Sequence, residues 1–251
     1  MQYELPIYVI IFLYGIVIGS FLNVLIYRLP LKENIATESS HCMSCGHKLQ
    51  WYDLVPLVSY MMLGGKCRYC KTKISAQYPV IEAVNGFGYV LIFIMNGFNF
   101  TGILYALCFS MLTAITVIDW RTYEIPLGLN ITILVLGAIH LALDYHNFLY
   151  YLIGMVSVSG FLLLLFIITG GRGIGGGDIK LMFAAGLLLG WKHIILALVI
   201  GCIIGSIVHL TLMRIKGKGR VLAFGPYLSI GIFTVMLFGS QILDWYIGLL
   251  F

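Results

Sequence analysis

Long apolar runs, separated by short polar connections, set the strongest limit on what this chain can fold into. A helix needs about 20 predominantly apolar residues to cross a bilayer, and most of the runs are long enough. The chain is 61% hydrophobic and only 10% charged, whereas soluble domains carry about 25% charged residues. The sequence therefore predicts an all-α polytopic membrane protein with about eight transmembrane helices. The runs are Pro6–Tyr27, Pro79–Asn96, Gly102–Ile118, Pro126–Leu143, Phe148–Thr169, Ile179–Trp191, Ile194–Met213 and Val221–Phe238.

The basic residues predict the orientation of these helices. The 15 Lys and Arg residues lie in clusters between the apolar runs or at their ends, a distribution that argues against a nucleic-acid-binding surface. With eight spans, every cluster except Lys192 falls on one side of the membrane, and the positive-inside rule makes that side cytoplasmic. The clusters are Arg28–Lys73, Arg121, Arg172 with Lys180, Lys192, and Arg214–Arg220.

One segment departs from the apolar composition. Leu29–Tyr78 is polar and basic and contains four of the six cysteines. The sequence therefore predicts a first transmembrane helix in residues 1–28, a small cytoplasmic insert in residues 29–78, and a larger transmembrane domain in residues 79–251.

The insert contains two Cys-x-x-Cys pairs, "CMSC" at 42–45 and "CRYC" at 67–70. Two turns that each present two thiolates can close a tetrahedral zinc site, and a reducing cytoplasm favours metal binding over disulfides. We therefore expect Cys42, Cys45, Cys67 and Cys70 to bind a structural zinc ion. The alternatives are two redox pairs, unliganded thiols, or replacement of one thiolate by His41 or His47.

Among the ten acidic residues, Asp119 and Asp178 each stand at the end of a predicted span. Asp119 closes the third span in "TVIDWRTYEIP", and Asp178 opens the sixth in "GGGDIKLM". Two crossings lie between them, so both carboxyl groups must return to the same side of the membrane. The topology therefore allows Asp119 and Asp178 to meet at the cytoplasmic boundary.

Two carboxyl groups that share a low-dielectric site cannot easily both ionise. One holds a proton while the other stays charged, so the pair can activate a water molecule and protonate a leaving amine. Gly175, Gly176 and Gly177 would let an extended peptide approach, because glycine adopts unusual dihedral angles and has no side chain. The structural alternative is that Asp178 caps a helix and Asp119 pairs with Arg121. Glu82, near the start of the second span, is a candidate for ordering the insert or for binding a ligand.

Five motifs in order resemble the type IV prepilin peptidases, also called leader peptidase/N-methyltransferases, which contain a Gly-x-Gly-Asp aspartic protease motif. The motifs are "GSFLNVLIYRLP" (19–30), the cysteine-containing segment 42–82, "IDWRTYEIP" (118–126), "GGGDIKLM" (175–182) and "AFGPYLSIG" (223–231).

The resemblance implies a bifunctional enzyme of the bacterial inner membrane. Such an enzyme removes the basic leader from prepilins or pseudopilins after a glycine, on the cytoplasmic side. It then N-methylates the new terminal residue with S-adenosylmethionine. On this basis Asp119 and Asp178 would be the catalytic residues of a peptidase domain in residues 79–251. The sequence shows no strand–glycine-loop–helix fingerprint for the methyl donor, so it predicts no residues for that site.

Two other functions fit parts of the same pattern. Carboxyl groups in a membrane and a broken sixth span also occur in ion- or proton-coupled transporters, although the chain shows no internal repeat. A zinc-bearing assembly subunit without catalysis would need the cysteines but not the aspartates.

Overall fold

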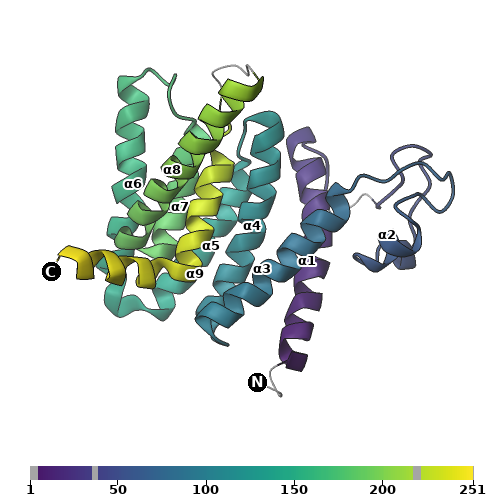
Figure 1. Cartoon of the computed structure of the whole chain (residues 1–251), viewed down its shortest axis with the longest axis horizontal. Coiled ribbons are helices and arrows are strands. Elements are labelled where there is room, and N and C mark those ends of the chain that lie inside the picture. Colours follow the sequence, from purple (N-terminus) through teal and green to yellow (C-terminus); the bar gives the residue numbers. More distant parts are fainter. Residues whose placement is uncertain (1–4, 36–38, 217–221, 251) are drawn as a thin grey trace. The chain divides into compact units, whose positions relative to one another are not determined.

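The structure is a computed structural model that describes residues 5–35, 39–216 and 222–250 (Figure 1). Within these ranges the chain is helical, apart from turns and two isolated β-bridges. Most of the basic cluster Arg214–Arg220 and the N-terminal Met1–Glu4 lie outside the described residues. The chain divides into two compact units, Met1–Ile94 (unit 1) and Met95–Phe251 (unit 2).

Unit 1 consists of two long helices and the insert that joins them. Helix α1 spans Leu5–Leu31 and helix α3 begins at Gln77 and runs to Asn96, while the insert contains the short helices η1 (Trp51–Asp53) and α2 (Val58–Met62). The two long helices approach closely through glycine: a Cβ atom on Gly15 would lie 2.7 Å from the Cα atom of Gly86. The Asn85 amide also donates a hydrogen bond of 2.8 Å to the Gly15 carbonyl oxygen.

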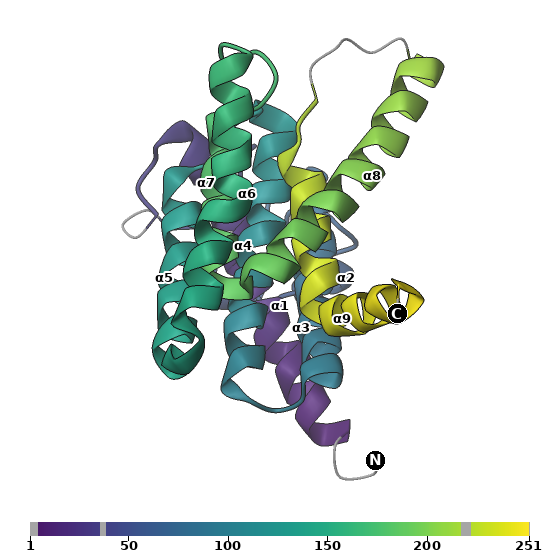
Figure 2. The same ribbon diagram turned by 90° about the vertical axis from the view of Figure 1, so that its left-hand side faces the viewer.

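Unit 2 is a bundle of six helices and a short connecting turn (Figures 1 and 2). Helix α7 is its centre, because it packs against α5, α6, α8 and α9. The helix has 14 residues, and eight of those between Leu181 and Leu189 are buried. The elements are α4 (Phe100–Thr122), α5 (Leu127–Leu143), η2 (Tyr145–Asn147), α6 (Phe148–Ile168), α7 (Gly176–Leu189), α8 (Trp191–Lys216) and α9 (Gly225–Leu250).

The predicted all-α membrane fold is confirmed, and each predicted span corresponds to a helix, although two of these helices are short. Among the described residues, six helices are long and apolar enough to cross a membrane: α1, α3, α4, the segment of η2 and α6, α8 and α9. Helix α5 is apolar but has 17 residues, and α7 has 14. A 14-residue helix is about 21 Å long, shorter than the hydrocarbon core. The count of eight complete spans is therefore not confirmed.

Helices α6 and α7 come close together at a pair of glycines. A Cβ atom on Gly154 would lie 2.5 Å from the Gly186 carbonyl oxygen, and a Cβ atom on Gly186 would meet the Gly154 main chain in the same way. Small residues of this kind let helix backbones approach closely in membranes, where packing rather than the hydrophobic effect drives association.

We expect Gly186→Ala to destabilise the protein by about 2 kcal/mol, because the added methyl group would collide with the main chain of α6. The loss can be measured by thermal or denaturant unfolding in detergent. Gly128→Ala in α5 is the matched control, since a Cβ atom there meets nothing within 4 Å. The control should be neutral or stabilising by up to about 1 kcal/mol. Equal stability of the two variants would contradict this packing.

Candidate active site and metal centre

Asp119 lies in the last turns of α4 and is 5% exposed. A negative charge at the C-terminus of its own helix is unfavourable, because the helix dipole is negative at that end. The compensation comes from another helix: the main-chain N–H of Gly225, the first residue of α9, donates a hydrogen bond of 2.9 Å to Asp119 Oδ2. Asp119 is therefore held at the favourable N-terminus of α9.

Position 225 has space for glycine only. A Cβ atom at this position would lie 2.7 Å from Asp119 Oδ2, closer than non-bonded atoms approach. The neighbouring Pro226 suits the first turn of a helix, where a main-chain N–H has no partner within the helix. The "FGP" sequence thus begins α9 and delivers a hydrogen-bond donor to Asp119 at the same point.

Asp178 lies in the first turn of α7 and is 8% exposed. Its Oδ2 atom accepts a hydrogen bond of 3.3 Å from the main-chain N–H of Gly175. The N-cap residue is Gly175, so Asp178 is not the N-cap but accepts the N–H of that residue from the third position of the helix, where the positive end of the helix dipole favours its charge. This contact uses one of the roughly four acceptor positions of a carboxylate.

The loop after α4 packs directly on the glycine segment before Asp178. A Cβ atom on Gly177 would lie 3.0 Å from the Cβ atom of Ile125, so glycine lets the two segments touch. Helix α4 therefore ends beside the segment where α7 begins. The structure therefore brings the two aspartates to the same end of unit 2, as the number of crossings predicted. Two buried carboxyl groups that share one site can bind and deprotonate a water molecule between them.

The four cysteines of the insert come together at one point. Their sulfur atoms all lie within 4.8 Å of one another, and Cys42 Sγ is 3.8 Å from Cys70 Sγ. Four thiolates bound tetrahedrally at a Zn–S distance of about 2.3 Å have sulfur atoms about 3.8 Å apart. The cysteine cluster therefore fits a zinc ion.

The two knuckles have the same backbone fold. The N–H of Cys42 donates to the His47 carbonyl at 2.9 Å, and the N–H of Cys67 donates to the Thr72 carbonyl at 2.9 Å. Each turn closes with a residue at positive φ, Gly46 at 69° and Lys71 at 60°. Repeated turns with this geometry present paired sulfur atoms to one metal ion.

The hydrogen bonds of the second knuckle favour the thiolate form that a metal requires. Contacts with the Thr72 hydroxyl and main chain lower the pKa of the Cys70 thiol to about 6. Main-chain contacts with Cys45 and Ser44 also lower the pKa of the Cys42 thiol, whereas the pKa of the Cys45 thiol is raised to about 11, because its main-chain contact with His47 is outweighed by desolvation and the neighbouring Cys42 and Cys70. His47 stacks on Tyr69 with ring centroids 3.6 Å apart. Within the described ranges, the cluster that could hold a metal contains the four cysteines and neither His41 nor His47.

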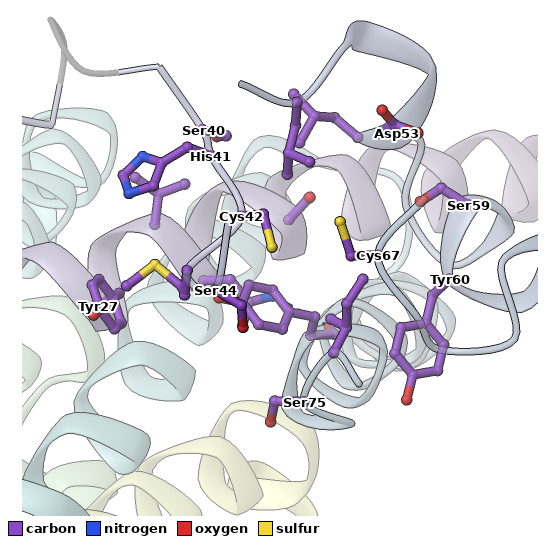
Figure 3. Close-up of a pocket in the computed structure, with 18 of the residues that line it drawn as sticks. Tyr27, Ser40, His41, Cys42, Ser44, Asp53, Ser59, Tyr60, Cys67 and Ser75 are labelled. Atoms are coloured by element: carbon purple, nitrogen blue, oxygen red, sulfur yellow. Dashed lines mark hydrogen bonds between the residues drawn. The ribbon is translucent and has the colours of Figure 1, made fainter. Parts of the chain in front are cut away.

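Glu82 connects the insert to α3 within unit 1. Its Oε2 atom accepts a hydrogen bond of 2.8 Å from the N–H of Leu57, a residue at φ 60°. The carboxylate therefore fixes an unfavourable backbone turn at the start of α2. Glu82 also lines a cavity of about 390 Å³ that extends to Cys42 and Cys67 (Figure 3).

Comparison with known proteins assigns both parts of the chain. Residues 13–96 match the bacterial peptidase A24 N-terminal domain, and residues 106–210 match the type IV leader peptidase family. The chain is also 30% identical to the prepilin leader peptidase/N-methyltransferase of Aeromonas salmonicida, over 95% of this chain and 93% of that protein. The chain belongs to the type IV leader peptidase family.

Other relatives are similar in sequence to this family member over nearly its full length. It is 31% identical to the prepilin leader peptidase/N-methyltransferase of Pseudomonas aeruginosa, covering 94% of this chain and 91% of the relative. It is 28% identical to the protein of the same name from Legionella pneumophila, covering 99% and 97%. No solved structure matches the chain. The family predicted from the five motifs is confirmed, and so is the prediction that the chain is an enzyme of this peptidase family.

Sequence reasoning missed the role of Gly225 in this leader peptidase. The motif that contains it was recognised only as part of a resemblance, although a Gly-Pro pair at a helix start was visible in the sequence. Nothing local connects Gly225 to Asp119, because the hydrogen bond joins residues 106 positions apart.

We expect the purified leader peptidase to bind one zinc ion per chain, measured by elemental analysis. Cys67→Ser should remove the ion, because a serine hydroxyl cannot replace the buried thiolate. Cys108→Ser is the control, since Cys108 is buried in α4 outside the cluster. Full zinc content in the Cys67 variant, or loss of zinc in the Cys108 variant, would contradict the assignment.

Proposed function

We propose that the chain cleaves the basic leader from type IV prepilins or pseudopilins, using Asp119 and Asp178 as an aspartate dyad. One observation carries the proposal: two buried aspartates lie at the same end of unit 2, each held by a glycine main-chain N–H. The printed names of the relatives, all prepilin leader peptidases, supply the substrate class.

The dyad divides the proton transfers between its two carboxyl groups. The ionised carboxylate takes a proton from a bound water molecule, and the water oxygen attacks the scissile carbonyl carbon. The protonated partner then donates its proton to the leaving amide nitrogen as the carbon–nitrogen bond breaks. The products are a leader that ends in a carboxylate and a mature pilin with a new α-amine.

The glycine segment before α7 suits a substrate that must unfold locally. A peptide bond inside a helix is shielded, so the substrate has to present an extended strand near the dyad. A Cβ atom on Gly176 would meet nothing within 4 Å, so the chain is open there. Non-helical backbone is tolerated at membrane depth where protein or water surrounds it.

Basic residues support a cytoplasmic position for the dyad. Arg121, Arg172, Lys180 and Arg214 all belong to the loops or helix ends at the same end of unit 2 as the two aspartates. By the positive-inside rule this end faces the cytoplasm. A prepilin anchored in the same bilayer by its apolar helix would present its basic leader on that side. Because both aspartates stand at helix ends rather than mid-span, we favour the peptidase over the transporter alternative.

We further propose that the chain methylates the α-amine that cleavage creates, as the N-methyltransferase in the names of its relatives implies. The methyl donor would be S-adenosylmethionine, which supplies an electrophilic methyl group on a positively charged sulfur. Zinc would have a structural role, because four cysteine ligands leave no open coordination position.

We expect Asp119→Asn and Asp178→Asn each to lower the cleavage rate by about 100-fold or more, because an amide can neither accept nor donate the required proton. The assay reconstitutes the full chain with a Pseudomonas aeruginosa prepilin in proteoliposomes and follows the substrate N-terminus by mass spectrometry. Asp244→Asn, an exposed position in α9, is the control. Wild-type cleavage by either dyad variant would exclude the dyad.

We expect Gly225→Ala to slow cleavage by about tenfold to 100-fold, since displacement of a catalytic group by a fraction of an ångström has effects of this size. The added methyl group would push the Asp119 carboxylate away from its N–H donor. Gly248→Ala in the same helix is the control, because a Cβ atom there meets nothing within 4 Å. If both variants cleave equally, Gly225 does not position Asp119.

A further inference from the structure

Unit 1 contains a cavity of about 390 Å³ that none of the peptidase chemistry uses (Figure 3). One wall is α1, a second is the start of α3, and the remainder comes from the two cysteine knuckles and α2. Its size lies within the range of about 300–1,000 Å³ that is typical of small-molecule sites. The cavity therefore has room for one cofactor-sized ligand.

Glu82 is the most unusual group in this cavity. It is 6% exposed, and its carboxylate is held by the N–H of Leu57 and the side chain of Ser20, both neutral groups. Along the described chain, it has no ion-pair partner. A buried charge without a counter-charge is costly. A cationic ligand would supply that counter-charge.

The other charged groups leave Glu82 available for such a ligand. The lining contains two more carboxylates, Glu33 and Asp53, and two cations, Arg28 and Lys73. Asp53 is paired with Arg68 at 2.7 Å, whereas Glu33 and Lys73 are exposed. The guanidinium of Arg28 donates to the carbonyl oxygens of Asn34 and Ile35 at 3.1 and 3.3 Å. Among the described residues, no ion pair joins any of these groups to Glu82.

The remaining lining matches a polar molecule with a flat ring. Tyr27, Tyr60 and Tyr78 offer aromatic faces, which attract both planar bases and cations. Five serines also line the cavity, and hydroxyl groups of this kind bond readily to ribose: Ser20, Ser40, Ser44, Ser59 and Ser75. A phospholipid headgroup or free phosphate fits poorly, because an anion would meet the carboxylate of Glu82.

We propose that this cavity binds S-adenosylmethionine and that Glu82 balances its positive charge. The inference rests on the proposed methyl transfer and adds the residues that hold the donor. In the reaction the neutral amine of the substrate forms a bond to the methyl carbon. The carbon–sulfur bond breaks, its electron pair stays on sulfur, and the proton of the amine leaves to water.

The test measures donor binding to the purified, zinc-loaded full chain by titration calorimetry with S-adenosylmethionine. Glu82→Gln should weaken binding by about tenfold or more, because a counter-charge is lost. The amide oxygen can still accept the hydrogen bond from Leu57, so zinc content and thermal stability should stay near wild type. Glu124→Gln, an exposed position in unit 2, is the matched control.

A second variant blocks the cavity without touching a polar contact. Val24→Trp, on the α1 wall, should abolish donor binding, since the indole ring fills the space. Val17→Trp is its control, because Val17 lies on the same helix, is exposed and does not line the cavity. Val24→Trp and Val17→Trp should both still cleave prepilin at the wild-type rate. Only Val24→Trp should release unmethylated pilin.

The outcomes separate this inference from the proposed peptidase. If the wild type cleaves prepilin but Glu82→Gln and Val24→Trp bind the donor as well as the wild type does, the donor site lies elsewhere and the inference is wrong. If the wild type cleaves prepilin without binding the donor, the inference is also wrong while the peptidase stands. If the wild type cleaves nothing, the proposed function itself fails.

Discussion

Two carboxyl groups buried at one end of a helix bundle are the constraint on which unit 2 depends. A buried carboxylate needs hydrogen-bond donors, and lipid offers none. Here the donors are main-chain N–H groups at the starts of α9 and α7, contributed by Gly225 and Gly175. Neither contact neutralises the carboxylate charge with a cation. The helix ends that hold these N–H groups must therefore meet at one place, which fixes how α4, α7 and α9 are arranged.

Glycine is the common means by which this membrane fold brings chain segments together. Gly154 and Gly186 let α6 and α7 touch backbone to backbone, and Gly177 lets the Asp178 segment lie against Ile125. Gly225 does the same for Asp119. A methyl group would collide at Gly154, Gly186 and Gly225 and would be crowded at Gly177, so close packing as well as hydrogen bonds positions the two aspartates. In a bilayer, where apolar burial does not distinguish helix from lipid, close packing is the main source of such specificity.

The sequence predicted the features that follow from the length of the apolar runs, from the number of membrane crossings and from the spacing of the cysteines. Apolar runs located the long helices, the number of crossings brought Asp119 and Asp178 to one end, and the doubled Cys-x-x-Cys pattern located the sulfur cluster. Contacts between distant residues were not predictable in the same way. The bond from Leu57 to Glu82 joins positions 25 apart and the bond from Gly225 to Asp119 joins positions 106 apart. Both hydrogen bonds depend on how the helices pack against one another, and no short sequence pattern predicts that packing. The short length of α7 could not be predicted from the span count either, because a helix enclosed by protein does not need to match the thickness of the bilayer.

The insert of unit 1 is stabilised in a different way from the helix bundle of unit 2. Its insert is too small to fold around a core of its own, so its shape depends on the cysteine cluster and on Glu82. The same elements line the cavity: Cys42 and Cys67 form part of one wall, and Glu82 contributes the uncompensated charge. Four thiolates around a divalent ion would leave two further negative charges beside that wall, which adds to the attraction for a cation. The groups that keep the insert folded are therefore also the groups that give the cavity wall its negative charge. Replacement of one of the four cysteines by histidine would alter both properties together, because a neutral imidazole would take the place of one thiolate and remove one negative charge from the wall.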